Sequence, residues 1–456
     1  MVDDGSVARA GTFEALKNPG FRRYFAGQGV SLIGTWLQAA AVRWIVYEQT
    51  RSEFLLGVVE MASLMPGLLV GLVAGLLADR VPPRRMILLT LSWQTLQATV
   101  LAVLVGLGIV EFWQLALILA LGRVGVTFEL TSRQVLLYDL VGVEGLTNAI
   151  ALNSGLFNAT RVIGPALAGI CLAALGPTSC FVLNALSYLA AIAAVATISL
   201  PARRPRRGTS RGTSELLGGL DYLRRNRRVR VHFELMAAFG VVGMGYEAMI
   251  PAFASDLVGT GVRGYSLILA SAGLGATAGA LAVARLSGTP RKDRLIVAGA
   301  AVFGVFLGIA GLFPVWSGPS WPDWLRLGTA AASVLGVGFG AALFYSSVQT
   351  SIQLMVPDHL RGRIMGVWMI LYSASVPLGA LWTGRAAAEW GVSNVIFPSA
   401  VGCLAMALGV AASGALRLGG APAPADPLLG QPSLTVPQQP ARAGGQRPRA
   451  ARRPPQ

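Results

Sequence analysis

Four charged side chains stand inside long apolar stretches of the sequence: Arg43, Glu60, Arg123 and Glu247. A charge in the hydrocarbon layer of a membrane is costly and usually faces a cavity or another charge. A carboxylate there can exchange protons, because burial favours its protonated form whereas water or a nearby cation favours its ionised form. We therefore expect Glu247 to be the first candidate proton carrier, with Arg123 as its charge partner. Glu60 and Arg43 should lie at similar depth, either as a pair or as two side chains that reach toward the membrane interface.

Other kinds of chemistry lack the residues they need. Cys171, Cys180 and Cys403 lie in apolar stretches without paired spacing, and neither histidine belongs to a His-Glu-x-x-His pattern. The two lysines are not part of a Gly-Lys-Ser/Thr sequence, which a phosphate-binding P-loop requires. We expect no enzymatic activity, no metal, no cofactor and no ATP site of that kind. Any uphill movement would draw on an ion gradient or on a partner subunit.

The composition indicates that lipid is the solvent for much of the chain. Hydrophobic residues make up 54% of the 456 residues and charged residues only 13%, against about 25% charged residues in soluble domains. The net charge of +16 suggests a nucleic-acid partner at first sight. The arginines, however, stand in short runs between apolar stretches, which is typical of loops on one side of a membrane. We therefore expect membrane lipid as a partner and no nucleic acid.

The apolar stretches predict an all-α integral membrane protein. A helix needs about 20 mostly apolar residues to cross a bilayer, and this length fits twelve times. Six spans fall within residues 25–200 and six within residues 231–416. Glycines four residues apart in corresponding spans, such as Gly71 and Gly75 against Gly275 and Gly279, suggest two pseudo-symmetric six-helix bundles.

The loop charges predict the orientation. We expect the protein to lie in the inner (plasma) membrane. Basic loops stay in the cytoplasm, so its cytoplasmic side should carry residues 1–24, the linker 201–230 and the tail 417–456. The linker contains ten arginines and two acidic residues. The tail is rich in Pro, Gln and Arg and is predicted to be disordered.

One loop sequence carries a family resemblance. Gly75-Leu-Leu-Ala-Asp79-Arg80-Val-Pro-Pro-Arg84-Arg85 resembles the loop between spans two and three of the major facilitator superfamily, although prolines replace a glycine and a basic residue of that pattern. A carboxylate at a helix end can accept charge-assisted bonds from arginines and from a neighbouring helix N-terminus. The resemblance implies a cytoplasmic gate formed by the residues of this loop together with Glu129.

The region 128–165 and the sequence Val356-Pro-Asp-His-Leu-Arg-Gly-Arg363 are similar to the efflux branch of that superfamily, which includes enterobactin exporters and macrolide pumps. The resemblance covers about residues 13–416 and implies a secondary transporter that works by alternating access. We separately expect the protein to be a monomer. We expect it to export a small amphipathic compound of the drug or siderophore type in exchange for protons. The alternatives are uptake, facilitated transport, lipid flipping and a membrane sensor or scaffold that transports nothing.

Several polar side chains within the predicted spans are candidates for the substrate path. They could equally form hydrogen bonds between helices, and Arg161 could be a structural brace. These candidates are Gln38, Asn153, Arg161, Tyr345 and Gln349.

Overall fold

A computed structural model describes residues 13–78, 81–198, 220–286, 292–317 and 320–413. All regular secondary structure in these ranges is helical, as the sequence predicts. Ten helical segments are long and apolar enough to cross a membrane. One of them, Asn148–Ala196, has 49 residues, more than twice the length that a single crossing needs.

The N-terminal group of helices consists of η1 (Glu14–Lys17), α1 (Pro19–Thr50), α2 (Glu53–Ala78), α3 (Pro83–Gly106) and α4 (Phe112–Ala196). Asn18 caps α1, because its side chain accepts hydrogen bonds from the backbone N–H groups of Gly20 (2.8 Å) and Phe21 (3.1 Å). Two glycines in the left-handed region, Gly142 (φ 68°) and Gly176 (φ 78°), interrupt α4. The α4 segment therefore consists of three helical runs, residues 112–141, 143–175 and 177–196.

The C-terminal group is preceded by a short helical stretch at residues 220–225. Its helices are α6 (Arg227–Val242), α7 (Tyr246–Ala252), the π-helix η2 (Phe253–Val258), α8 (Gly261–Arg285), α9 (Lys292–Gly311), α10 (Phe313–Trp316), α11 (Asp323–Met355), α12 (Asp358–Trp390) and α13 (Val392–Ser413). Together α6, α7 and η2 make one candidate span, Arg227–Val258.

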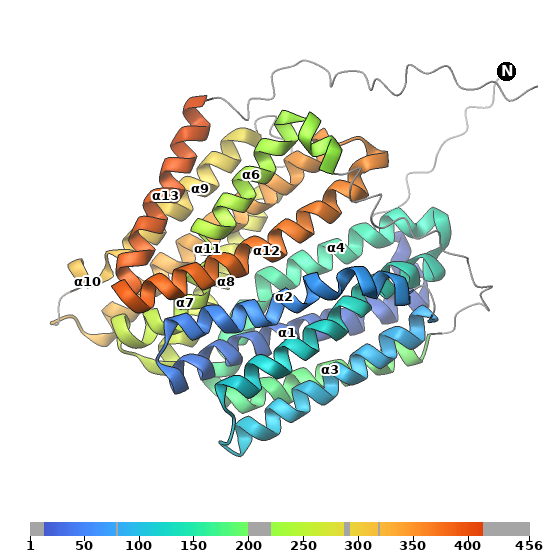
Figure 1. The fold of residues 1–456 in the computed structure, drawn as a ribbon, viewed down its shortest axis with the longest axis horizontal. Helices are drawn as coiled ribbons and strands as arrows, with labels where there is room; N and C mark the ends of the chain where they lie inside the picture. The colour runs from blue at the N-terminus through green and yellow to red at the C-terminus, as the bar shows by residue number, and fades with distance from the viewer. Residues whose placement is uncertain (1–12, 79–80, 199–219, 287–291, 318–319, 414–456) are drawn as a thin grey trace, which may run out of the picture. The chain divides into compact units, whose positions relative to one another are not determined.

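The two groups lie side by side, with α2 against α12 and α4 against α8 (Figure 1). Glycines allow this approach. A Cβ atom on Gly57 of α2 would lie 2.6 Å from the carbonyl oxygen of Ala380 on α12. A Cβ atom on Gly273 of α8 would lie 2.6 Å from the backbone nitrogen of Ala166 on α4. Both distances are too short for a real side chain, so the helix backbones touch at these two crossings.

Some boundaries differ from the sequence-based expectation. The first membrane helix begins at Pro19 rather than at residue 25, and α6 begins at Arg227, inside the predicted linker 201–230. Asn226 explains the second difference, since its side chain caps α6 by accepting a bond from Val229 N (3.3 Å). Residues 201–219 of the linker and the tail 417–456 lie outside the described residues.

Candidate functional site

Three charged side chains meet where α1, α2 and α7 come together, and we call them the charged triad: Arg43, Glu60 and Glu247. Arg43 Nε donates to Glu60 Oε1 (2.5 Å) and Arg43 Nη1 donates to Glu247 Oε1 (3.1 Å). The exposed fractions of the three side chains are 11%, 16% and 23%. One guanidinium thus holds a carboxylate of the N-terminal group and a carboxylate of the C-terminal group at the same time.

The position of each triad residue follows from the helix ends. Arg43 lies seven residues before the end of α1, and Glu60 lies seven residues after the start of α2. Equal spacing from a shared turn places the two residues at the same depth, so the pairing considered from the sequence is observed. Glu247 differs from the expectation, because its ion-pair partner is Arg43 and not Arg123.

Arg123 lies against α2 instead. A Cβ atom on Gly67 of α2 would lie 2.8 Å from Arg123 Nε, and no hydrogen-bond partner for this buried nitrogen exists among the described residues. A glycine at residue 67 leaves room for the guanidinium within the N-terminal group.

The charged triad continues along one face of α1. Tyr47 follows Arg43 by four residues and shares its face, and Arg51, the residue directly after the last residue of α1, follows Tyr47 by four more. The Tyr47 hydroxyl donates to the carboxylate of Asp256 on η2. Arg51 donates to Ser255 Oγ (2.6 Å) and lies 3.8 Å from Asp256. This face, which we call the α1 stripe, joins α1 to the helical run α7–η2 over roughly 12 Å at 1.5 Å per residue.

Tyr265 of α8 fixes the adjacent face of α1. Its hydroxyl donates to the carbonyl oxygen of Ala40 (3.1 Å), and its ring stacks on Trp44 with 5.5 Å between centroids. Both aromatic side chains are buried. The hydrogen bond and the stacked rings fix the rotation of α1 next to Arg43.

Arg161 on α4 forms a second polar contact between the groups. Its Nη2 donates to the hydroxyl of Tyr372 on α12 (2.6 Å). Its guanidinium carbon lies 4.6 Å from the ring centroid of Tyr372 and 5.1 Å from that of Tyr345 on α11. Of the five substrate-path candidates, Arg161 and Tyr345 are thus in direct contact.

The other path candidates are placed differently. Gln38 is buried and accepts a hydrogen bond from Asn184 Nδ2 on α4 (2.8 Å), which makes it a tie within the N-terminal group. Asn153 on α4 and Gln349 on α11 are half-buried.

The predicted gate is only partly within the described residues. Asp79 and Arg80 lie outside them, and Gly75 belongs to the last part of α2. Glu129 is 1% exposed, pairs with Arg133 and accepts a hydrogen bond from Gln94 Nε2 (2.5 Å). These described contacts of Glu129 are all within the N-terminal group.

The two arginines that follow the predicted gate loop differ in burial. Arg84 donates to the carbonyl oxygens of Val195 (3.3 Å) and Ala196 (2.5 Å) at the end of α4. A cation at a helix C-terminus is favourable, so Arg84 ties α3 to the last run of α4. Arg85 is exposed.

Sequence reasoning missed three residues of this region: Asp256, Tyr265 and Asn184. Asp256 had a usable signal, because the Arg43-x₃-Tyr47-x₃-Arg51 spacing requires acidic or polar partners on a facing helix. Tyr265 and Asn184 had none, since single polar residues in apolar helices are common.

Comparison with known proteins identifies the family of the chain. Residues 10–435 match the family described as transmembrane secretion effector, a family of major facilitator transporters. The chain belongs to this family. It is a membrane transporter of the efflux branch and not an enzyme, as the sequence predicts.

Several relatives of this chain are named as efflux proteins. Macrolide efflux protein A of Streptococcus pyogenes is 22% identical over 82% of this chain and 91% of its own length. The multidrug efflux pump Tap of Mycolicibacterium fortuitum is 25% identical over 79% of this chain and 85% of its own. The enterobactin exporter EntS of Shigella boydii is 25% identical over 80% and 85%.

Solved transporters share the fold. The nucleoside transporter NupG (D323A mutant) has a TM-score of 0.66 at 12% identity, covering 87% of this chain and 99% of that structure. A bacterial homologue of the human lysosomal transporter Spinster has a TM-score of 0.64 at 14% identity, covering 90% and 99%.

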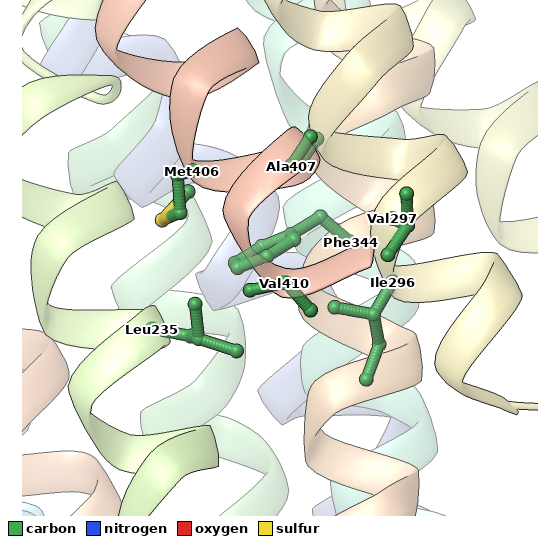
Figure 2. Close-up of a pocket in the computed structure, with 8 residues that line it drawn as sticks. Leu235, Ile296, Val297, Phe344, Met406, Ala407 and Val410 are labelled. Atoms are coloured by element: carbon green, nitrogen blue, oxygen red, sulfur yellow. The ribbon is translucent and has the colours of Figure 1, made fainter. Parts of the chain in front are cut away.

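One pocket of this secretion effector lies apart from the charged triad, within the C-terminal group. Figure 2 shows side chains from α6, α9, α11 and α13 around it. All are apolar: Leu235, Ile296, Val297, Ala300, Phe344, Met406, Ala407 and Val410. Such a lining has no group that could orient a polar compound or carry a proton, so the pocket is a packing gap in the helix bundle.

Proposed function

We propose that this protein exports a small amphipathic compound in exchange for protons, by alternating access between two six-helix bundles. One observation carries the proposal: Arg43 holds Glu60 of the N-terminal group and Glu247 of the C-terminal group together in a largely buried position. A proton on Glu247 would remove the ion pair between the two groups. The protonation state of one carboxylate would thereby bias the conformation of the whole transporter.

The proposed cycle uses the same contacts in sequence. With Glu247 ionised, the triad and the α1 stripe hold the two groups together on the side where α1 ends. A proton that Glu247 takes up from that side weakens the innermost contact, because it replaces an ion pair by a hydrogen bond from the Arg43 guanidinium to a neutral carboxyl group. The two groups then separate on that side and release the compound, and loss of the proton to the opposite side completes the exchange.

The proposed topology has twelve spans and cytoplasmic termini. Twelve is reached when Asn148–Ala196 is divided at Gly176 and when α2, with 26 residues, is counted as a span. The end of α1 then faces the outside of the plasma membrane. Reporter fusions at Gly208 and after Leu416 should both read as cytoplasmic, and an outside signal at either position would contradict the count.

The substrate class is proposed from the relatives. A macrolide pump, a multidrug pump and a siderophore exporter share this architecture at 22–25% identity. Their names cover several kinds of compound, which favours an amphipathic substrate over a nutrient of one fixed structure.

The test uses inside-out vesicles with an imposed acidic interior. Two dyes with the same ring system serve as probes, anionic fluorescein and cationic rhodamine 6G, and their content is measured after lysis at a fixed pH. We expect the wild-type protein to accumulate at least one dye beyond vesicles that lack it. Glu247→Gln should lose the gradient-driven part but keep downhill exchange. Glu389→Gln is the matched control, because Glu389 pairs with Arg385 on the exposed surface.

Each other outcome assigns a different function. Accumulation that ignores the pH gradient indicates facilitated transport, and movement in the opposite direction indicates uptake. Binding of a dye without any movement indicates a sensor or scaffold. Proton-driven pumping by Glu247→Gln with the wild-type pH dependence would exclude Glu247 as the carrier and make Glu60 the next candidate.

A further inference from the structure

Arg161 has no carboxylate at ion-pair distance within the part of the chain that the structure describes. It lies fifteen residues before the turn at Gly176, roughly 22 Å along the helix at 1.5 Å per residue, so it is deep in its span. Among the described residues no carboxylate lies within ion-pair distance of it, in contrast to Arg43. A guanidinium in a low-dielectric position is costly when its charge and its donors are not matched.

The aromatic side chains around Arg161 satisfy it only in part. The guanidinium has five N–H donors, and the residues that the structure describes accept one hydrogen bond from them, at the Tyr372 hydroxyl. The rings of Tyr345 and Tyr372 lie 5.5 Å apart at 78°, and the guanidinium lies near both. Cation–π contacts of this kind stabilise the charge but leave most N–H donors free.

Tyr345 adds a second unsatisfied donor. Its hydroxyl is buried and has no hydrogen-bond partner among the described residues. Its ring is held edge-on against Phe239 of α6, with 5.4 Å between centroids. A buried hydroxyl without a partner is unusual in proteins and calls for an explanation. Because the Tyr345 hydroxyl and the Arg161 guanidinium both donate hydrogen bonds, the partner that would satisfy them is a hydrogen-bond acceptor.

We propose that Arg161, Tyr345 and Tyr372 form the binding site for an anionic oxygen group of the transported compound, with a carboxylate as the best fit. A planar carboxylate can accept two parallel bonds from a guanidinium, and Tyr345 can donate a further bond. The faces and edges of the two tyrosine rings would contact an aromatic ring next to the carboxylate. This inference rests on the proposed function, because it assigns the substrate of the same transporter.

The alternative role for Arg161 is a structural brace between helices. A brace is complete without a ligand, and its donors are satisfied by the protein itself. Arg161 remains half-buried at the contact of α4 with α11 and α12, so part of its side chain is accessible where the two groups meet. Free donors together with remaining access favour a ligand site.

The proposed anion site at Arg161 is separate from the proposed proton carrier, Glu247. Glu247 is near enough to interact electrostatically with Arg161, but its carboxylate is bound by Arg43 at 3.1 Å. The guanidinium of Arg161 is therefore not bound by Glu247, and its N–H donors are left for the compound.

The experiment measures dye binding to the purified full-length protein in nanodiscs of phosphatidylcholine, by fluorescence anisotropy at one pH and without any gradient. We expect saturable binding of fluorescein, which carries a carboxylate next to an aromatic ring. Arg161→Gln should weaken it by at least about tenfold, since it removes one partner of a charge-assisted contact. Tyr345→Phe should weaken it by about threefold to tenfold, because it removes one neutral hydrogen bond. Rhodamine 6G should bind both variants as well as or better than the wild type.

Two controls keep the result clear. Arg385→Gln removes an arginine of the exposed surface and should leave both dyes unaffected. If Arg161→Gln does not fold, Tyr345→Phe alone carries the test, since it removes a single hydroxyl that has no partner.

Three results would overturn the proposal. The wild type could show no saturable fluorescein binding, or both variants could bind fluorescein with wild-type affinity. The variants could also lose affinity for both dyes equally, which would indicate that Arg161 is a structural brace. The assay does not involve proton-driven transport. Failure of the Glu247→Gln test with fluorescein binding intact would therefore refute the coupling scheme and leave the anion site standing.

Discussion

Arg43→Gln is the most informative substitution for the charged triad. Arg43 contributes one positive charge between two carboxylates, and glutamine keeps most of the side-chain volume while removing that charge. In the variant, Glu60 and Glu247 would face each other across the two groups without a cation. The structure thus predicts a loss of stability in addition to any effect on transport.

The expected size follows from burial. At an effective dielectric constant of about 20, unit charges 3.1 Å apart, the separation of Arg43 from Glu247, interact with about 5 kcal/mol. Removing one partner of a buried pair typically costs about 3–5 kcal/mol, because an uncompensated charge remains. The carboxylates can lower this cost by binding protons. We therefore expect a destabilisation near the lower end, about 3 kcal/mol.

The assay compares thermal unfolding of detergent-purified variants measured side by side. The control is Arg385→Gln, whose ion pair with Glu389 has exposed fractions of 62% and 47%. Such a surface pair contributes about 0–1 kcal/mol. Arg43→Gln should thus unfold at a clearly lower temperature than Arg385→Gln. Adding Glu60→Gln to Arg43→Gln should restore part of the loss, because one of the two unpaired carboxylates is removed.

Equal unfolding temperatures for Arg43→Gln and Arg385→Gln would refute the reasoning. They would mean that water solvates the triad well and that Arg43 is not the ion-pair link between the two groups. A further drop on adding Glu60→Gln would refute the charge argument in particular, since the double variant contains less unpaired charge.

Three further substitutions test other contacts. Asp256→Asn removes the ion pair with Arg51 and should shift the equilibrium toward the outward-open state by at most about 1 kcal/mol. The shift is measured as faster chemical labelling of a cysteine introduced beside the α1 stripe. Unchanged labelling would contradict a gating role of Asp256. Gly169→Val places a side chain against the backbone of Ser266 on α8. We expect the free energy of unfolding to fall by about 1–3 kcal/mol and most dye transport to be lost. Wild-type stability together with wild-type transport would disprove the close contact of α4 and α8. Asp79→Asn should cripple transport while expression and membrane insertion stay normal, because the change removes a charge without changing the size of the side chain; normal transport rates would contradict a role of this loop as a gate.

Hydropathy predicts most of the fold because the bilayer imposes a length on every span. The sequence also places Arg43 and Glu60 at the same depth, since both are counted from the same short turn. The start of α1 at Pro19 was harder to predict. A membrane helix can extend into water beyond its apolar part, and the cap by Asn18 rather than hydropathy sets its first residue.

The pairing of Glu247 could not be predicted from the sequence. Depth along a helix follows from residue numbers, but the rotation of the helix and the identity of its neighbour do not. Arg123 and Arg43 are both arginines within spans, and only packing decides between them. Gly67 makes room for Arg123 against α2, and Tyr265 and Trp44 fix the rotation of α1 that brings Arg43 to Glu247.

The contacts of the α1 stripe should break in a fixed order. Arg51 is 61% exposed, so water replaces its partners easily and the outermost contact opens and re-forms often. Arg43 is mostly shielded from water and separates rarely. The outer contacts therefore determine how often the transporter begins to open, whereas the proton on Glu247 determines how often an opening is completed. Substitutions at Arg51 should therefore change how often opening begins. Substitutions at Arg43 should instead change how often an opening is completed, which is a different step of the transport cycle.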